Sequence, residues 1–223
     1  MQRTLFITGT DTGVGKTVLT ALLTRFLRER GAHAAALKPI CSGGRADARA
    51  LHSAMAGALT LDEINPWHFR AAIAPLLAAR RENETVKLSQ VFAHISALQK
   101  RFNVLLVEGA GGLLSPLGDN FNSRDLISAL RAAPIIVAQN KVGVVNHIFL
   151  TLEALPKSIR PKAKIVLMLP PKPDASAKTN AELLAEFSTA KTFSLPWLGE
   201  NVNASAALKI PRVRRILKAL TEI

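Results

Sequence analysis

The segment LFITGTDTGVGKTVLTALLTRFL, residues 5–27, constrains the fold of this 223-residue chain more than any other. An apolar run ends at a cluster of small residues, passes through Gly15, Lys16 and Thr17, and continues with apolar residues at helical spacing. A strand, a glycine-rich turn and a helix in this order form a loop whose backbone N–H groups bind phosphate, aided by the dipole of the helix N-terminus. The segment therefore predicts an α/β fold with a phosphate-binding loop.

The spacing of the glycines differs by one residue from the common pattern G-x-x-x-x-G-K-[ST], which would place Gly at position 10. That residue is Thr10, and Gly9 leaves five residues before Gly15. In such a loop Lys16 would reach the β- and γ-phosphates, and Thr17 would ligate Mg²⁺. The motif alone indicates a nucleoside triphosphatase or a kinase-like protein, and the alternative is an ordinary strand–turn–helix joint.

The rest of the chain alternates short apolar runs with helical patterns, which is typical of a mostly parallel twisted sheet with helices on both faces. We expect a single P-loop domain over residues 1–223, because no linker or low-complexity segment interrupts the pattern. Pro66 and Pro75 predict a loop over residues 65–75. Strands are expected near residues 3–8, 32–40, 103–112, 133–140, 163–169 and 191–199, and helices near 16–30, 47–56, 89–100, 142–155, 181–187 and 211–220.

Two charged residues are expected at the carboxyl edge of this sheet, where ligands bind in open α/β folds. Glu108 ends the apolar run NVLLVE, and three of the next four residues are glycine. A carboxylate there could hold Mg²⁺, or it could simply cap a tight turn. Lys38 follows the second expected strand and could stabilise charge on a transferring phosphoryl group, or it could be a solvated surface lysine. Asp47 by itself reads as the N-cap of a helix.

The net charge of +13 suggests an anionic partner, such as nucleic acid, a membrane surface or a small anion. The basic residues are scattered, apart from a run over residues 209–218, so nucleic-acid binding is kept only as an alternative. The single cysteine, Cys41, excludes an intramolecular disulfide, and no apolar stretch is long enough to span a bilayer. We expect a cytoplasmic protein that binds neither nucleic acid nor membrane.

Six stretches, in order, resemble the dethiobiotin synthetase family. Five of them are FITGTDTGVGKT at residues 6–17, LKPICSG at 37–43, NPWHF at 65–69, LLVEGAGGLLSPL at 105–117 and KVGVVNHIFLT at 141–151. The sixth, LPWLGEN at 195–201, resembles the family's late Pro-Trp-Leu loop. The phosphate loop with its extra residue, together with VEGAGG, is quite specific to this family.

The resemblance implies an ATP-dependent cyclo-ligase of biotin biosynthesis, which joins CO₂ to 7,8-diaminopelargonate and closes a cyclic urea. One amine forms a carbamate, ATP converts it into a carbamic–phosphoric anhydride, and the second amine displaces phosphate. Mg²⁺ is the implied cofactor, ATP the co-substrate, and CO₂ or bicarbonate the carbon source. Another P-loop ATPase of the same architecture, partition-type or cofactor-amidating, is the competing interpretation.

The resemblance also implies roles for individual residues. Lys16 and Lys38 would be catalytic, and Thr17, Asp47 and Glu108 would hold Mg²⁺. ATP would bind to Gly13, Val14, Gly15, Lys16, Thr17, Val18, Asp47, Glu108, Gly109, Ala110, Gly111, Pro196, Trp197 and Leu198. The substrate would contact Thr12, Ser42 and Gly112, together with Val142, Gly143, Val144, Val145 and Asn146 from a partner subunit. A homodimer with its sites at the interface follows.

Two of the chain's departures from the family concern the nucleotide base and the substrate. Met168 and Leu169 stand where the family has an Asn-Asp pair that reads the adenine base. Because an apolar pair cannot supply such hydrogen bonds, we hypothesise a relaxed choice of nucleotide, or base contacts from the backbone of residues 196–198. The loop RAAIAPLLAA at residues 70–79 also differs and keeps only Pro75 of the family's usual residues, so its effect on substrate binding is open.

Overall fold

A six-stranded sheet organises the computed structural model, which describes residues 3–200 and 202–222. The strand order is β10-β9-β8-β1-β5-β2, and every neighbouring pair in this sheet is parallel. The expected fold class, a parallel sheet covered by helices, is confirmed. The strands of this sheet are β1 (Arg3–Gly9), β2 (Ala34–Leu37), β5 (Val104–Glu108), β8 (Ala133–Gln139), β9 (Lys164–Met168) and β10 (Lys191–Leu195).

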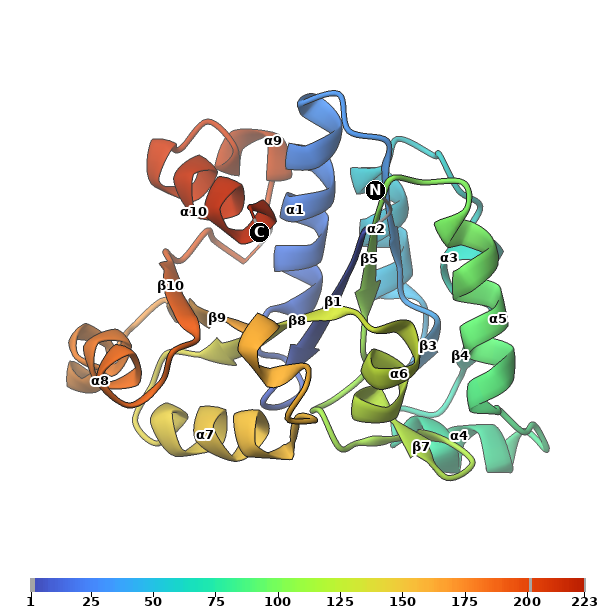
Figure 1. Ribbon diagram of the computed structural model, residues 1–223. Coiled ribbons are helices and arrows are strands. Elements are labelled where there is room, and N and C mark those ends of the chain that lie inside the picture. Colours follow the sequence, from blue (N-terminus) through green and yellow to red (C-terminus); the bar gives the residue numbers. More distant parts are fainter. Residues whose placement is uncertain (1–2, 201, 223) are drawn as a thin grey trace.

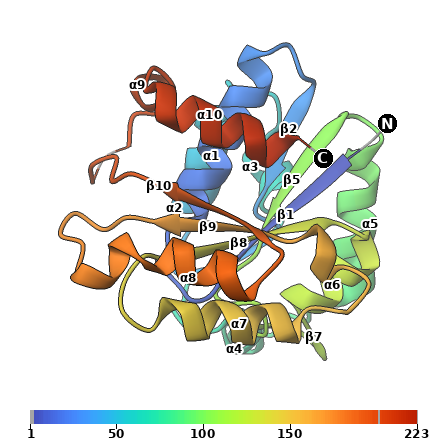
Figure 2. The same cartoon turned by 60° about the vertical axis from the view of Figure 1, so that its left-hand side comes forward.

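Helices lie on both faces of the sheet, as Figures 1 and 2 show. The first helix packs with the second, ninth and tenth on one face, while the fifth to eighth lie toward the other. No helix in the described part of the chain combines the length and the apolar character needed to cross a membrane. The helices are α1 (Lys16–Glu29), α2 (Ala46–Ala54), α3 (Leu61–Ile64), α4 (Pro75–Arg81), α5 (Leu88–Gln99), α6 (Ser123–Leu130), α7 (Val144–Ala154), α8 (Asn180–Phe187), α9 (Ala204–Ala207) and α10 (Pro211–Thr221), with 3₁₀ turns η1 (Arg160–Lys162) and η2 (Ala175–Lys178).

The hydrophobic core follows the strands, which carry apolar residues on both faces because helices cover both sides. In β1, Leu5, Phe6 and Ile7 are at most 1% exposed. The edge strand β2 consists of three alanines and a leucine, all of them fully buried. This rigid base fixes the carboxyl ends of the strands, where the candidate site lies.

The expected strand over residues 32–40 divides into two pieces. Strand β2 ends at Leu37, and β3 (Ile40–Ser42) begins after Pro39. Proline carries no N–H group for a sheet ladder, and the N–H of Lys38 donates to the carbonyl of Ile64 instead of to a strand. The chain therefore leaves the main sheet at Lys38, which places this side chain at the sheet's edge.

The loop expected over residues 65–75 was wrong in part. Within it, β4 (Trp67–Phe69) pairs in parallel with β3, with Ile40 opposite Trp67. Pro75 begins α4 rather than interrupting a loop, which fits the preference of proline for the first turn of a helix. Other elements were not expected from the sequence: α3, α6, α9 and the hairpin of β6 (Pro116–Gly118) and β7 (Phe121–Asn122). The capping box of Asn122 and Asp125 was a usable signal for α6.

Candidate active site

The loop between β1 and α1 has the form that the glycine-rich segment predicts. Gly13 and Gly15 adopt left-handed backbone conformations, with φ of 73° and 98°. A Cβ atom on Gly15 would also lie 3.0 Å from the thioether methyl of Met168, so a larger residue meets both backbone strain and a close contact. The ammonium of Lys16 donates a 2.7 Å hydrogen bond to the carbonyl of Asp11 and so closes the loop.

Glu108 lies beside this loop because β5 pairs directly with β1. In the register of the two strands, Ile7 stands opposite Glu108. The hydroxyl of Thr17, in the first turn of α1, donates a 2.7 Å hydrogen bond to Oε1 of Glu108. The other carboxylate oxygen of Glu108, Oε2, is buried and has no hydrogen-bond partner among the described residues. Glu108 therefore does not act as a simple turn cap.

Lys38 joins the same group from the opposite side of β5. Strand β2 pairs with β5 so that Leu37 stands opposite Val107, and the next residues, Lys38 and Glu108, become neighbours. The Lys38 ammonium lies 2.7 Å from Glu108 Oε1 and 2.9 Å from Asp47 Oδ2. Its side chain is only 4% exposed, so the alternative of a solvated lysine was wrong.

Asp47 reaches this cluster from the first turn of α2. The N-cap of that helix is Arg45, which corrects the expectation that Asp47 caps it. Burial raises the pKa of the Asp47 carboxyl, but the positive charge and hydrogen bond of Lys38 outweigh this and hold that pKa below its usual value. Burial likewise opposes the charged form of Lys38, and the carboxylates of Glu108 and Asp47 overcome it and raise the pKa of Lys38 above its usual value.

The electrostatics of Lys16 are different. Burial, followed by repulsion from Lys38, lowers the pKa of Lys16 to about 8, although the nearby carboxylates partly oppose the shift. A lysine without an anion at this position is thus poorly stabilised as a cation. A bound phosphate would supply the missing negative charge, which is what an anion-binding loop requires.

One cavity of about 740 Å³ is lined by both predicted catalytic lysines, by all three predicted metal ligands, and by two of the predicted substrate residues, Thr12 and Ser42. The altered loop also lines it, with Ala72, Ile73, Ala74 and Pro75, and presents only apolar side chains. The hydroxyl of Ser42 donates a 2.6 Å hydrogen bond to the Ile73 carbonyl and fixes that loop against β3. The predicted site residues that line this cavity are Thr12, Gly13, Gly15, Lys16, Thr17, Val18, Lys38, Ser42, Asp47, Glu108, Ala110 and Gly111.

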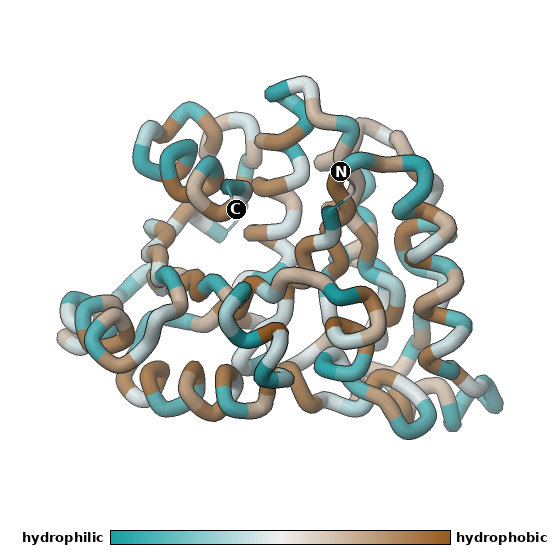
Figure 3. Tube along the Cα trace, viewed as in Figure 1, coloured by the Kyte–Doolittle hydropathy of each residue, from teal (hydrophilic) through white to brown (hydrophobic). Residues whose placement is uncertain are grey.

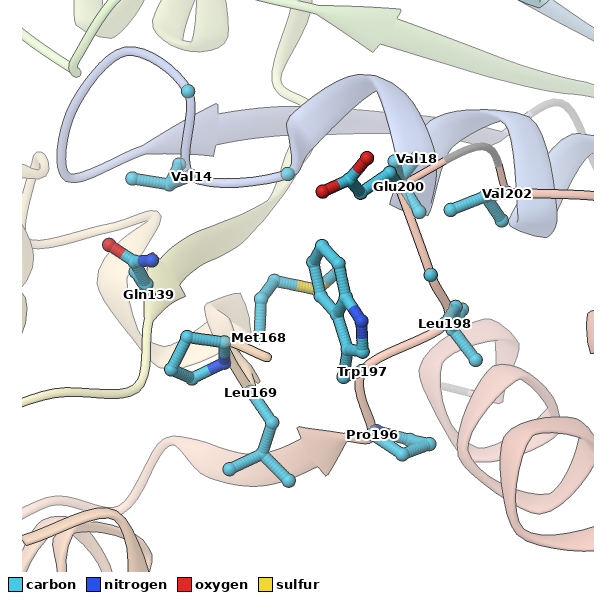
Figure 4. Close-up of a pocket in the computed structure, with 14 residues that line it drawn as sticks. Val14, Val18, Gln139, Met168, Leu169, Pro196, Trp197, Leu198, Glu200 and Val202 are labelled. Atoms are coloured by element: carbon cyan, nitrogen blue, oxygen red, sulfur yellow. The ribbon is translucent and has the colours of Figure 1, made fainter. Parts of the chain in front are cut away.

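A second pocket, of about 200 Å³, adjoins the phosphate loop (Figure 4). The side chains of Met168 and Trp197 both line it, as Figure 4 shows. Its lining includes Gly13, Val14, Gly15 and Val18 from the loop and helix, and Leu169, Pro196 and Leu198 from the other side. Two polar residues in the lining, Gln139 and Glu200, were not singled out from the sequence, although Glu200 belongs to the quoted stretch LPWLGEN.

The segment of residues 142–146 lies outside both pockets within this chain. Gly143, with φ of 84°, precedes α7, and Val142 is 74% exposed.

Gly112 lines a third hollow, of about 490 Å³, together with Leu114, His147 and Leu150. Gly109 contributes its carbonyl, which accepts a 3.0 Å hydrogen bond from Lys38.

The cluster offers oxygen ligands suited to a hard divalent cation. Thr17 supplies a hydroxyl, while Asp47 and Glu108 supply carboxylates. The buried, unpartnered Oε2 of Glu108 fits such a cation, because a buried charged oxygen is costly unless it is paired. Mg²⁺ prefers one or two carboxylates together with phosphate oxygens and water, so this set is appropriate for it beside a nucleotide.

Comparison with known proteins agrees with this geometry. Residues 3–205 match a family model described as an AAA domain. The chain is 41% identical over 213 residues to the ATP-dependent dethiobiotin synthetase BioD of Anaeromyxobacter dehalogenans (strain 2CP-C), covering 93% of this chain and 96% of the relative. It is 35% identical to the protein of the same name from Bacillus subtilis (strain 168), with 82% of each chain covered.

Solved structures with little sequence identity share the fold. A ParA family ATPase from Chlorobium tepidum TLS matches with a TM-score of 0.63 at 12% identity, over 100% of both chains. Cobyrinic acid a,c-diamide synthase from Mycobacterium smegmatis, with bound ATP analog and magnesium, matches with a TM-score of 0.57 at 14% identity, over 99% of this chain and 94% of that one. These matches show the architecture alone, whereas the curated relatives and the motifs show that the chain belongs to the ATP-dependent dethiobiotin synthetase family.

Proposed function

We propose that this protein uses ATP to join CO₂ to 7,8-diaminopelargonate and to close the cyclic urea of dethiobiotin. One amine of the substrate adds to CO₂ and forms a carbamate. A carbamate oxygen takes the γ-phosphoryl group of ATP and ADP leaves. The second amine then attacks the carbonyl carbon and expels phosphate. The phosphoryl transfer is needed because a carbamate oxygen is otherwise a poor leaving group.

The single observation that carries the proposal is that two lysines of different origin line one cavity with two carboxylates. Lys16 comes from the phosphate loop and Lys38 from the end of β2. Lys16 would stabilise the charge of the transferring phosphoryl group, and Lys38 that of the carbamate. Both act in a largely buried site, where electrostatic stabilisation is stronger than in water.

Mg²⁺ would be held by Thr17, Asp47 and Glu108. When bound, it would neutralise phosphate oxygens and help to orient them for transfer. The Thr17 hydroxyl donates a hydrogen bond to Glu108 and keeps its oxygen lone pairs, which could ligate a metal ion. The unpartnered oxygen of Glu108 supports this assignment.

ATP would extend from the cavity into the pocket of Figure 4. The backbone of Gly13, Val14, Gly15 and Val18 would surround the phosphates together with Gly109, Ala110 and Gly111. The base would lie in the pocket with Trp197, Met168 and the backbone of residues 196–198. Because Met168 and Leu169 supply no side-chain hydrogen-bonding group of the amide or carboxylate kind, the choice of base would be relaxed.

The substrate would contact Thr12, Ser42 and Gly112, and its carboxylate tail would bind Val142, Gly143, Val144, Val145 and Asn146 of the partner subunit in a homodimer. The N-terminus of α7 suits a carboxylate because its backbone N–H groups and its dipole face that end. The exposed apolar side chains of Val142, Leu114 and Leu150 support an interface on this side of the molecule. Light scattering would measure the molecular mass of the protein in solution and so test for the homodimer. Mixing Lys38→Met with Asn146→Asp protein would test whether one chain completes the other's site, since activity should then recover.

The decisive test combines the protein with diaminopelargonate, bicarbonate, Mg²⁺ and ATP. We expect phosphate release that depends on the diamine, and a product of the mass of dethiobiotin. Omission of the diamine is the matched control. Equal ATP hydrolysis with and without the diamine would contradict the proposal and favour another P-loop ATPase.

A further inference from the structure

The hydrogen bonds of Lys38 use the full donor capacity of its ammonium. An ammonium group has three N–H donors. Those of Lys38 go to Glu108 Oε1 at 2.7 Å, to Asp47 Oδ2 at 2.9 Å and to the carbonyl of Gly109 at 3.0 Å. In this state Lys38 is therefore fully engaged with the protein and has no donor left for a substrate.

Two of these three acceptors belong to the residues assigned to the metal ion. A divalent cation held by Asp47 and Glu108 at the short distances typical of Mg²⁺ would stand within a few ångström of the Lys38 nitrogen. Two cations held by the same pair of carboxylates would repel each other strongly, because Lys38 and Glu108 are buried and poorly screened by water. The ammonium and the metal ion therefore compete for the same two carboxylates.

We propose that Lys38 holds the place of the metal ion in the nucleotide-free protein, and that arrival of the metal with its nucleotide displaces the Lys38 ammonium from Asp47 and Glu108 into the adjoining cavity. This inference rests on the proposed function and adds an order of events to it. The catalytic lysine becomes available to the carbamate only after the metal and the nucleotide are bound. Metal alone binds weakly, because it must break two ion pairs without the help of phosphate oxygens.

The fold explains why such a placeholder is present. The Glu108 side chain is fully buried, and a buried carboxylate without a partner strongly destabilises a folded chain. Lys38 supplies the partner while no metal is bound. Because the Lys38 ammonium is paired with both carboxylates, a competing cation has to displace it from them.

The test measures how tightly Mn²⁺ binds to the whole protein in the absence of nucleotide. Electron paramagnetic resonance of the free ion reports the binding. Lys38→Met removes the competing ammonium, and we expect it to bind Mn²⁺ about tenfold more tightly than the wild type. The matched control is Lys16→Met. It removes the same charge from the same cavity, but the Lys16 ammonium is bonded to the Asp11 carbonyl rather than to the carboxylates. We expect less than about a threefold change in that variant, because only the long-range repulsion between Lys16 and the metal ion is removed.

Equal tightening in Lys38→Met and Lys16→Met, or none in Lys38→Met, would overturn the inference. If Lys38→Met is unstable, Lys38→Gln repeats the test, and Mn²⁺ should raise the melting temperature of either variant more than that of the wild type. If Mn²⁺ raises the melting temperature of neither variant more than that of the wild type, the proposed displacement of Lys38 by the metal is contradicted. Mn²⁺ binding to the wild type with a non-hydrolysable ATP analogue separates the two proposals. If the wild type binds no Mn²⁺ under these conditions, the metal site of the proposed function is contradicted. If it binds Mn²⁺ but Lys38→Met binds Mn²⁺ alone no more tightly than the wild type does, only the displacement of Lys38 is contradicted.

Discussion

The ammonium of Lys38 lies 2.7 Å from Oε1 of Glu108, although 70 positions separate the two residues in the chain. They meet because β2 and β5 are adjacent parallel strands. Leu37 stands opposite Val107, and Lys38 and Glu108 are the residues that directly follow this pair. The pairing explains how the core tolerates a fully buried carboxylate at the end of β5. It also links the proposed metal ligands to the proposed catalytic lysine, because Thr17 and Lys38 both donate hydrogen bonds to Glu108 Oε1.

Replacing Glu108 by glutamine should lower diamine-dependent phosphate release by about a hundredfold or more, since it removes a carboxylate from both the metal and Lys38. Steady-state phosphate release at saturating Mg²⁺ measures the effect. Glu153→Gln is the control, because Glu153 is an exposed residue that pairs only with the surface residue Arg160 among the described ion pairs. Activity of Glu108→Gln close to that of the control would remove Glu108 from the site.

ATP binding should weaken as the pH rises above the pKa of Lys16, which is about 8. Negative phosphates favour the protonated lysine, so the bound state holds a proton that the free protein has lost above pH 8. Affinity should be constant below that pH and fall by up to about tenfold per pH unit above it. Quenching of Trp197 fluorescence in a Trp67→Phe background reports the binding. Lys16→Met should bind weakly and lose this slope, and an unchanged slope in that variant would assign the titration to another group.

Turnover with ATP, GTP and CTP should differ by no more than about tenfold, because Met168 and Leu169 cannot discriminate between bases through side-chain hydrogen bonds. Competition assays at equal nucleotide concentration provide the comparison. Introducing Met168→Asn together with Leu169→Asp should favour ATP over the other two. A strong ATP preference in the wild type would show that the backbone near Trp197 reads the base unaided.

Two glycines of the phosphate loop should respond differently to alanine. Gly13 has a φ of 73° and open space around a hypothetical Cβ, so Gly13→Ala should cost about 1 kcal/mol of unfolding free energy from backbone strain alone. At Gly15 the φ is 98° and Met168 lies 3.0 Å from the added atom, so about 2 kcal/mol is expected. Urea unfolding measures both. The additional Met168→Ala change should reduce the difference, and equal costs without it would show that the Met168 contact has no weight.

The sequence alone was sufficient for the features that depend on local pattern. Glycines, a lysine and a threonine between an apolar run and an amphipathic helix specify the phosphate loop, because the backbone conformation there allows little else. The alternation of apolar strands with helices specified a parallel sheet, and Glu108 at the end of an apolar run specified a carboxylate at its edge. All of these depend on residues close together in the chain.

Only the tertiary structure decided what Lys38 and Asp47 contact. Local pattern left Lys38 either at the ligand-binding edge or solvated and made Asp47 a helix cap. The order β1-β5-β2 and the packing of α2 bring Glu108 and Asp47 together against the Lys38 ammonium. Likewise, residues 65–75 became β4 and the start of α4 because β3 offered a free edge for pairing. Strand order and register arise from burying the whole core at once, so contacts between distant segments cannot be read from local periodicity.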